Sequence, residues 1–208
     1  MSSCGCCRDL VPKVELTEFQ VTRTVALFFA VSVQMFASAA SASEWSVEPS
    51  KSWLGFTGIM AKAPFDGRFQ RWRATISFDP AHPESGHARV TVDMASAVTG
   101  DKQKDTALPQ SEWFDVKTFP EAVFEVQSFR PNGTPSSYDA IATLTMRGVK
   151  MEVTMPLSIE VNGDTLHAKG GVGLLRSKFG VGQGQWTSAQ WVALEVATAF
   201  DVTATRSP

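Results

Sequence analysis

The side chains best suited to catalysis or metal binding are few in this sequence. Its three histidines are His82, His87 and His167, and no two of them have a metal-binding spacing such as H-x-x-x-H. The carboxylates Asp101 and Asp105 could form a general acid–base pair, but helix capping and loop ion pairs explain them more simply. These residues therefore give no positive support for an enzyme.

Two features near residue 180 suggest anion binding. Gly180-Val-Gly182-Gln-Gly184 superficially resembles a phosphate-binding loop, but no helix pattern follows it, so a flexible turn is the simpler interpretation. Arg176 and Lys178, just before it, could hold a phosphate or carboxylate head group at the mouth of a cavity. A solvated pair of loop cations explains them equally well. The sequence contains no P-loop, dinucleotide fingerprint or G-x-S-x-G motif.

The composition excludes some partners. The 208 residues carry 19 basic and 21 acidic side chains, and the basic ones are scattered, which gives no argument for nucleic-acid binding. The three cysteines, Cys4, Cys6 and Cys7, lie in the first ten residues, so the rest of the chain is free of disulfides. They could bind a metal, but no second pair or histidine lies nearby, and we expect no metal site.

The N-terminal region has the features of a targeting segment. Residues 25–37 are apolar but too short to span a bilayer comfortably, and the small residues after them offer A-x-A cleavage sites at 37–39 and 40–42. We therefore predict a secretory signal peptide over residues 1–43 and one domain over residues 44–208. Three bases balance three acids before Val25, which suggests that the working start lies near Val14 or Val21. An uncleaved anchor helix is the alternative.

Residues 149–160 carry the clearest strand pattern. Their odd positions are all apolar and their even positions are polar or proline, which predicts a long strand with one buried face. Pro156 cannot donate to a sheet ladder, so it indicates an edge, a bulge or a corner. Residues 146–149 predict a tight hairpin turn from the preceding strand.

The same period of two recurs along the chain and predicts an all-β fold of about eight strands. The expected strands are Glu44–Val47 continued by Ser52–Gly58, Phe65–Phe78, Ala88–Met94, Glu121–Arg130, Tyr138–Met146, Val149–Glu160, Thr165–Leu175 and Trp191–Thr205. An antiparallel meander of this size closes most easily into a barrel, which removes exposed edges and can hold one slender ligand. A sandwich with a filled core is the alternative.

Residues 95–120 break this pattern between the third and fourth strands. They contain charges, Gly100, Pro109 and the aromatic residues Trp113, Phe114 and Phe119. Such a long irregular connection is uncommon unless it packs on or covers something. We predict a cap over one end of the sheet, with a short helical turn at residues 102–108.

The candidate ligand-binding residues are inward apolar positions of the strands and aromatic residues of the connections. They are Phe56, Trp72, Ile76, Val92, Phe114, Phe124, Val126, Leu144, Met151, Val153, Met155, Leu157, Leu174, Phe179, Leu194, Val196 and Phe200. An ordinary packed core explains the same pattern. The methionines at positions 151 and 155 slightly favour an adaptable lining.

Four segments together resemble the YceI-like polyisoprenoid-binding proteins of bacteria. They are residues 65–72 with 76–80, residues 101–124, residues 144–149 and residues 175–182. They stand in the order typical of that family and cover nearly all of residues 44–205. The sequence departs from many relatives at Ala107, where a histidine is common, and in having Trp113-Phe114 in place of a phenylalanine pair.

The resemblance implies a lipocalin-like barrel in the periplasm whose elongated pore holds an isoprenoid chain, a quinone or a similar amphiphile. It implies carriage or sequestration without catalysis or a cofactor, and we consider a homodimer as a candidate assembly. Some relatives occur with b-type cytochromes, and the tryptophan form looks like that subgroup. A non-catalytic accessory module of such a membrane redox system, with a filled core, is thus the alternative function.

Overall fold

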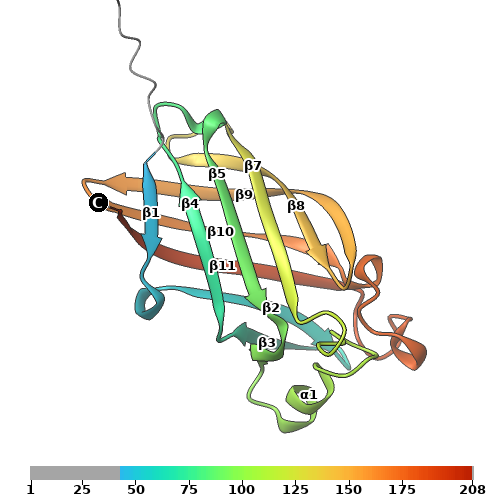
Figure 1. The fold of residues 1–208 in the computed structure, drawn as a ribbon. Helices are drawn as coiled ribbons and strands as arrows, with labels where there is room; N and C mark the ends of the chain where they lie inside the picture. Colours follow the sequence, from blue (N-terminus) through green and yellow to red (C-terminus); the bar gives the residue numbers. More distant parts are fainter. Residues whose placement is uncertain (1–42, 208) are drawn as a thin grey trace, which may run out of the picture. The chain divides into compact units, whose positions relative to one another are not determined.

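Alternating apolar and polar side chains fold the chain into strands that close on themselves. The computed structural model describes residues 43–207, so all but the last residue of the predicted signal peptide lies outside the described residues. The closed ring consists of β1 (Glu44–Val47), β4 (Trp72–Ser77), β5 (His87–Asp93), β7 (Glu121–Pro131), β8 (Ser137–Met146), β9 (Val149–Asn162), β10 (Thr165–Leu175) and β11 (Glu195–Arg206) (Figure 1). Because β1 pairs with both β4 and β11, the predicted eight-stranded antiparallel barrel is confirmed.

Three further strands extend the wall at one end. β2 (Trp53–Met60) continues along β11 beyond β1, β3 (Ala63–Phe69) forms a hairpin with β2, and the short β6 (Ala97–Val98) pairs with β3. The only α-helix of the described residues is α1 (Lys102–Ala107), which agrees with the predicted helical turn. Single 3-10 turns lie at Pro49–Lys51 (η1), Pro83–Ser85 (η2), Met94–Ser96 (η3), Arg176–Phe179 (η4) and Gly184–Trp186 (η5).

Two predicted strands were too long. The strand expected at Phe65–Phe78 is divided into β3 and β4, because the backbone N–H groups of Gln70 and Arg71 are bonded to Ser96 in the η3 turn instead of a strand. The strand expected at Trp191–Thr205 begins at Glu195. Residues 191–194 are instead bonded to the end of β2 and to η4, as described below.

The wall of the barrel parts between β9 and β10. Their pairing runs from Thr165 opposite Asn162 only as far as Gly170 opposite Leu157, although β9 begins at Val149 and β10 ends at Leu175. Pro156, at this point, has no N–H to donate, which agrees with the predicted edge or corner. We call the two stretches that are not paired with each other, residues 149–156 of β9 and 171–175 of β10, the seam.

The two ends of the barrel differ in construction. At the packed end, which carries β1 and the turns near residues 83, 133 and 163, Phe78 lies edge-to-face against Phe129 and Tyr138 with ring centroids 5.2 and 5.4 Å apart. The Trp45 indole N–H donates to the Phe78 carbonyl at 3.0 Å. At the capped end, α1 and the segment before β11 fold over the strand ends (Figure 1).

Candidate functional site: an apolar cavity inside the barrel

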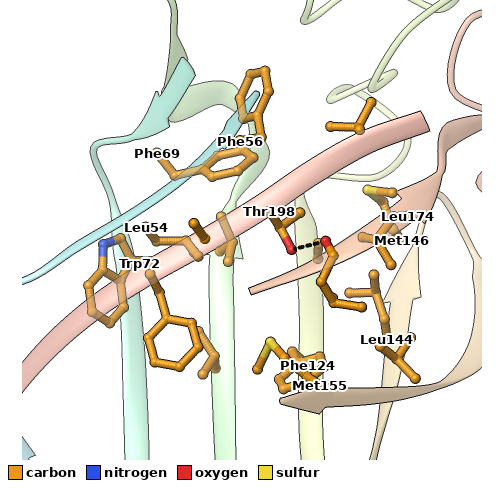
Figure 2. A pocket seen from close by; sticks show the side chains of 18 of the residues that line it. Leu54, Phe56, Phe69, Trp72, Phe124, Leu144, Met146, Met155, Leu174 and Thr198 are labelled. Carbon is orange, nitrogen blue, oxygen red and sulfur yellow. Dashed lines mark hydrogen bonds between the residues drawn. The ribbon is translucent and has the colours of Figure 1, made fainter. Parts of the chain in front are cut away.

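An apolar cavity of about 260 Å³ lies inside the barrel. Its wall is formed by inward side chains of most strands and by the cap residues Leu108, Trp113 and Phe114. Figure 2 shows Leu54, Phe56 and Trp72 on one side of this space and Leu144, Met146 and Leu174 on the other. Phe129 and Leu166 belong both to the lining and to the core cluster of the packed end, so the cavity reaches that end.

The lining offers almost no polar chemistry. The Thr198 hydroxyl already donates to the Val172 carbonyl at 2.9 Å (Figure 2). The hydrogen-bonded pair His167 and Asp201, whose Nε2 and Oδ1 atoms are 2.7 Å apart, is not part of the lining. Within residues 43–207 no group of three or more His, Cys, Asp or Glu could hold a metal, and no helix is long and apolar enough to cross a membrane. The cavity therefore suits hydrocarbon.

Two connections, residues 95–120 and residues 176–194, cover the cavity. Hydrogen bonds join them to each other and join the first of them to the β8–β9 hairpin. The Arg147 guanidinium, in the hairpin between β8 and β9, donates to the carbonyls of Ser111 and Trp113 at 2.9 and 2.6 Å. The backbone N–H groups of Gly182 and Gln183 both donate to the Glu112 carbonyl at 2.7 Å. The predicted cap at residues 95–120 thus closes over the barrel together with residues 176–194.

Arg176 organises the second of these connections. It is 3% exposed, and burial lowers the pKa of its guanidinium from the ordinary value. Its Nε–H donates to the Ala193 carbonyl at 2.9 Å. Its two Nη groups donate to carbonyls of Val181, Trp186, Ser188 and Val192 at 2.7–3.2 Å. The side chain thereby holds residues 181–193 together from inside.

The glycine-rich segment is part of this arrangement. Gly182 has φ +85°, and a Cβ at this position would lie 1.9 Å from Nη1 of Arg176. Glycine is therefore required both by the backbone conformation and by the close approach of the guanidinium. In this structure the segment surrounds the arginine, and Lys178, on the η4 turn, is exposed.

The structure brings together most of the predicted lining. The predicted residues that line the cavity are Phe56, Trp72, Ile76, Val92, Phe114, Phe124, Val126, Leu144, Val153, Met155, Leu157, Leu174, Val196 and Phe200. Met151, Phe179 and Leu194 are outside this lining. Phe179 is buried in the capped-end core, Met151 packs against that core, and Leu194 precedes the regular part of β11. That these side chains contact a ligand stays a prediction.

Several lining residues were missed. Leu108 and Trp113 come from the irregular cap, where alternation does not apply, and Phe65 and Phe69 lie on β3, which was merged with β4 in the sequence interpretation. The aromatic grouping of residues 113, 114 and 119 was the available signal for the cap. Arg176 borders the cavity, but its donors point to backbone carbonyls, and its predicted head-group role stays untested.

The fold and the cavity define a class: small up-and-down β-barrels that enclose a ligand-sized space. The family model of the YceI-like domain matches residues 45–204, and the chain belongs to this family. The resemblance noted in the sequence is thereby confirmed.

Curated relatives match part of the chain. A UPF0312 protein of Pseudomonas syringae pv. tomato is 32% identical over 97 residues, which are 47% of this chain and 50% of that protein. Protein YceI of Salmonella newport is 30% identical over 98 residues, again 47% and 50% of the two chains. The chain spans about half the length of the curated relatives that it matches.

Solved structures match more of the chain. BcnA of Burkholderia cenocepacia superposes with a TM-score of 0.74 at 34% identity, covering 77% of this chain and all of that one. A polyisoprenoid binding domain from Saccharophagus degradans gives a TM-score of 0.63 at 14% identity, covering 80% and 99% of the chains. A YCEI protein of Campylobacter jejuni gives 0.60 at 22% identity, covering 68% and 84%. The latter two share the fold.

Proposed function

We propose that this protein binds an isoprenoid-type lipid, such as a polyprenyl phosphate or a quinone, inside its barrel and carries or sequesters it in the periplasm. The observation that supports this function is the almost wholly apolar cavity inside the barrel. Contact with such a wall supplies roughly 25 cal/mol per Å² of apolar surface removed from water. Affinity can therefore come from the chain of the ligand without a specific polar contact.

The lipid class is supported by the relatives as well as by the wall. The Saccharophagus domain is described as binding polyisoprenoid, and it shares this fold. The cavity volume, about 260 Å³, is near the lower end of small-molecule sites, which favours a slender chain over a bulky ring system. Because the Arg176 donors already bind carbonyls, we propose Lys178 as the better candidate for a head group at the mouth.

The alternative, an accessory module of a b-type cytochrome system, predicts a filled core. The cavity favours the binding function over it. A catalytic role would need convergent polar groups, whereas the side chains facing the cavity are nearly all apolar. The binding function is therefore the one that this geometry supports best.

Native mass spectrometry of the protein isolated from a periplasmic extract, followed by lipid identification after denaturation, tests this function. We expect a stoichiometric polyprenyl or quinone adduct. A clean apo mass, together with failure to take up added polyprenyl phosphate or quinone, would contradict the proposal and favour the accessory module. Absence of the protein from the periplasmic fraction would contradict the proposed location alone.

Adjacent residues of β9 provide a matched pair of variants. Val153 lines the cavity, while Thr154 is exposed on the opposite face of the strand. Val153→Asp places a carboxylate against the bound chain and should abolish lipid uptake, whereas Thr154→Asp should leave it unchanged. Val153→Phe fills part of the cavity without adding a charge and should weaken lipid uptake. This variant keeps the test usable if Val153→Asp does not fold. Equal uptake by the Phe and Thr154→Asp variants would contradict the cavity as the site.

A further inference from the structure

The exposed large hydrophobic side chains of the described residues all lie at the capped end. They are Ile59, Met60, Val149, Leu175 and Trp191, and we call them the apolar rim. Single exposed apolar residues are common on protein surfaces, but they are normally scattered. Here the turns of the packed end, near residues 83, 133 and 163, contribute none. The clustering, and not the exposure of any one residue, calls for a partner.

Three rim residues lie on neighbouring backbone segments. The Ala61 N–H donates to the Trp191 carbonyl and the Ala193 N–H donates to the Ile59 carbonyl, each at 2.9 Å. On the other side of this segment, the Arg176 N–H donates to the Leu194 carbonyl at 2.9 Å. The end of β2, residues 191–194 and the end of β10 therefore lie side by side, and they carry Ile59, Trp191 and Leu175.

These side chains are exposed on fixed backbone. Trp191 is 56% exposed, Ile59 46% and Leu175 41%. Arg176 binds the carbonyls of Val192 and Ala193, directly after Trp191, so the indole is held outward by a bonded segment. Apolar side chains that are held in water in this way have an unfavourable hydration free energy, and burial against a partner would be favourable.

The rim adjoins the cavity. Val192 and Gly58 line the cavity. The rim residue Trp191 directly precedes Val192, and the rim residue Ile59 directly follows Gly58. Leu175 follows Leu174, which also lines the cavity, and it stands on the seam where β10 has no strand partner on that side. A surface that met the rim would therefore meet the barrel where its interior lies closest to the outside.

Two exposed lysines lie close in the chain to rim residues. Lys62 and Lys178 are exposed, and neither takes part in a salt bridge within residues 43–207. The β2–β3 turn holds Ala61 and Lys62 at φ 51° and 67°, a conformation that glycine and asparagine adopt at lower cost. The Glu195 carboxylate, beside Leu175 in register, is an opposing charge on this face.

We propose that the apolar rim docks on the surface of an anionic lipid bilayer, so that lipid passes between the membrane and the barrel. Exposed tryptophan with aliphatic neighbours and flanking lysines suits the interface of such a membrane, where the indole rests among the head groups and lysine attracts anionic lipid. The proposal rests on the proposed function for the lipid exchange, but the docking itself can be tested separately.

Flotation with vesicles of phosphatidylcholine and phosphatidylglycerol tests the docking, using protein isolated from cells that express the full chain. Trp191→Ser with Ile59→Ser should lower the bound fraction about tenfold or more relative to the unchanged protein. Lys62→Gln should lower it roughly fivefold on these vesicles and leave it unchanged on phosphatidylcholine alone. Both variants change exposed side chains, and an unchanged thermal midpoint verifies that they fold.

A relocation variant serves as the control. Thr134→Trp added to Trp191→Ser moves an exposed tryptophan to the packed end, and it should not restore flotation. Restored flotation would show that any exposed indole suffices and would overturn the rim as the docking surface. Equal flotation of the unchanged protein and the double serine variant would overturn it too. So would a dimer, seen by sedimentation, that the serine variants dissociate, because the rim would then pair two copies of the chain.

A lipid probe separates this proposal from the proposed function. Binding of cis-parinaric acid in the absence of vesicles should be the same for the unchanged protein and the serine variants, since Trp191 and Ile59 do not line the cavity. Loss of flotation with retained probe binding supports docking as a separate property. Failure of every form to bind the probe would count against the lipid-binding function and leave the flotation result to decide the docking.

Discussion

The packed end and the capped end bury their aromatic side chains by different means. At the packed end, Trp45, Phe129 and Tyr138 project from regular strands, and small residues such as Ala140 and Ala204 let them interlock. At the capped end, Phe114 and Phe179 come from irregular connections that fold over the strand ends. One end is closed by the strands themselves and the other by segments laid on top.

This difference explains where a ligand can be held. The interlocking strand side chains of the packed end line the far end of the cavity, so this end forms its floor. The connections at the capped end lie over the open end of the barrel. They are held in place by hydrogen bonds that involve the Arg147 and Arg176 side chains and the Glu112 carbonyl. Hydrogen bonds of this kind can open locally at a smaller cost than a packed core can. The capped end is therefore the end through which we expect ligand to enter.

The largest effect on stability should come from Phe78, which is fully buried at the packed end. Phe78→Ala removes both edge-to-face contacts and should lower the free energy of unfolding by about 4 kcal/mol. Phe56→Ala should cost clearly less, because Phe56 faces space that is already empty. Urea unfolding of the two variants measures the difference. Equal losses would mean that the two ends are equally well packed, against the comparison drawn above.

Much of the inward face of the strands could be predicted from the sequence, and the capped end only in outline. Alternation places residues such as Leu157 and Phe124 inward, because a strand buried on one face repeats every two residues. The same rule placed Leu194 inward, but residues 191–194 are bonded to β2 and η4 and do not belong to β11. Alternation could not show that β3 and β4 are separate strands. They are divided because the backbone N–H groups of Gln70 and Arg71 donate to Ser96, which lies 25 residues beyond Arg71 in the chain.

The role of Arg176 also has no signature in a single sequence. A buried arginine that binds five backbone carbonyls needs no acidic partner, so no charge pattern reveals it. The positive φ values of Gly180 and Gly182 are conditions of this arrangement, yet glycines two apart also suit a phosphate loop or a flexible turn. Only the spatial proximity of these residues distinguishes the three interpretations.

Removal of the arginine sharpens the comparison from the capped end. Arg176→Met keeps much of the side-chain volume but leaves buried carbonyls without donors, which should cost about 3 kcal/mol. The loss should be local, with faster hydrogen exchange of the amides of residues 181–193 and little change at the packed end. Lys178→Gln, nearby but exposed, should change stability by less than about 0.5 kcal/mol. Uniformly faster exchange would show that both ends unfold as one unit.

The smallest effect concerns the N-terminus of α1 in the cap. The Lys104 ammonium, 2.8 Å from the Asp101 carboxylate, and the N–H groups of Lys104 and Gln103 lower the pKa of Asp101 below its usual value of 3.8. A carboxylate with a lowered folded-state pKa stabilises the fold above its unfolded pKa, and this contribution disappears as the pH falls through the folded-state value. We therefore expect the helix cap to be intact at neutral pH and to weaken only below about pH 4.

Asp101→Asn isolates the charge from the cap. Asparagine still accepts N–H bonds at the N-cap but neither titrates nor attracts Lys104. The thermal midpoint of the unchanged protein should therefore exceed that of the variant slightly at neutral pH, and the difference should shrink as the pH falls below about 4. Because the site is exposed, added salt should also reduce the difference. No gap at neutral pH would mean that the side-chain oxygen, which asparagine keeps, and not the charge holds this part of the cap in place. A gap that stayed constant at low pH would mean that ionisation of Asp101 is not its source.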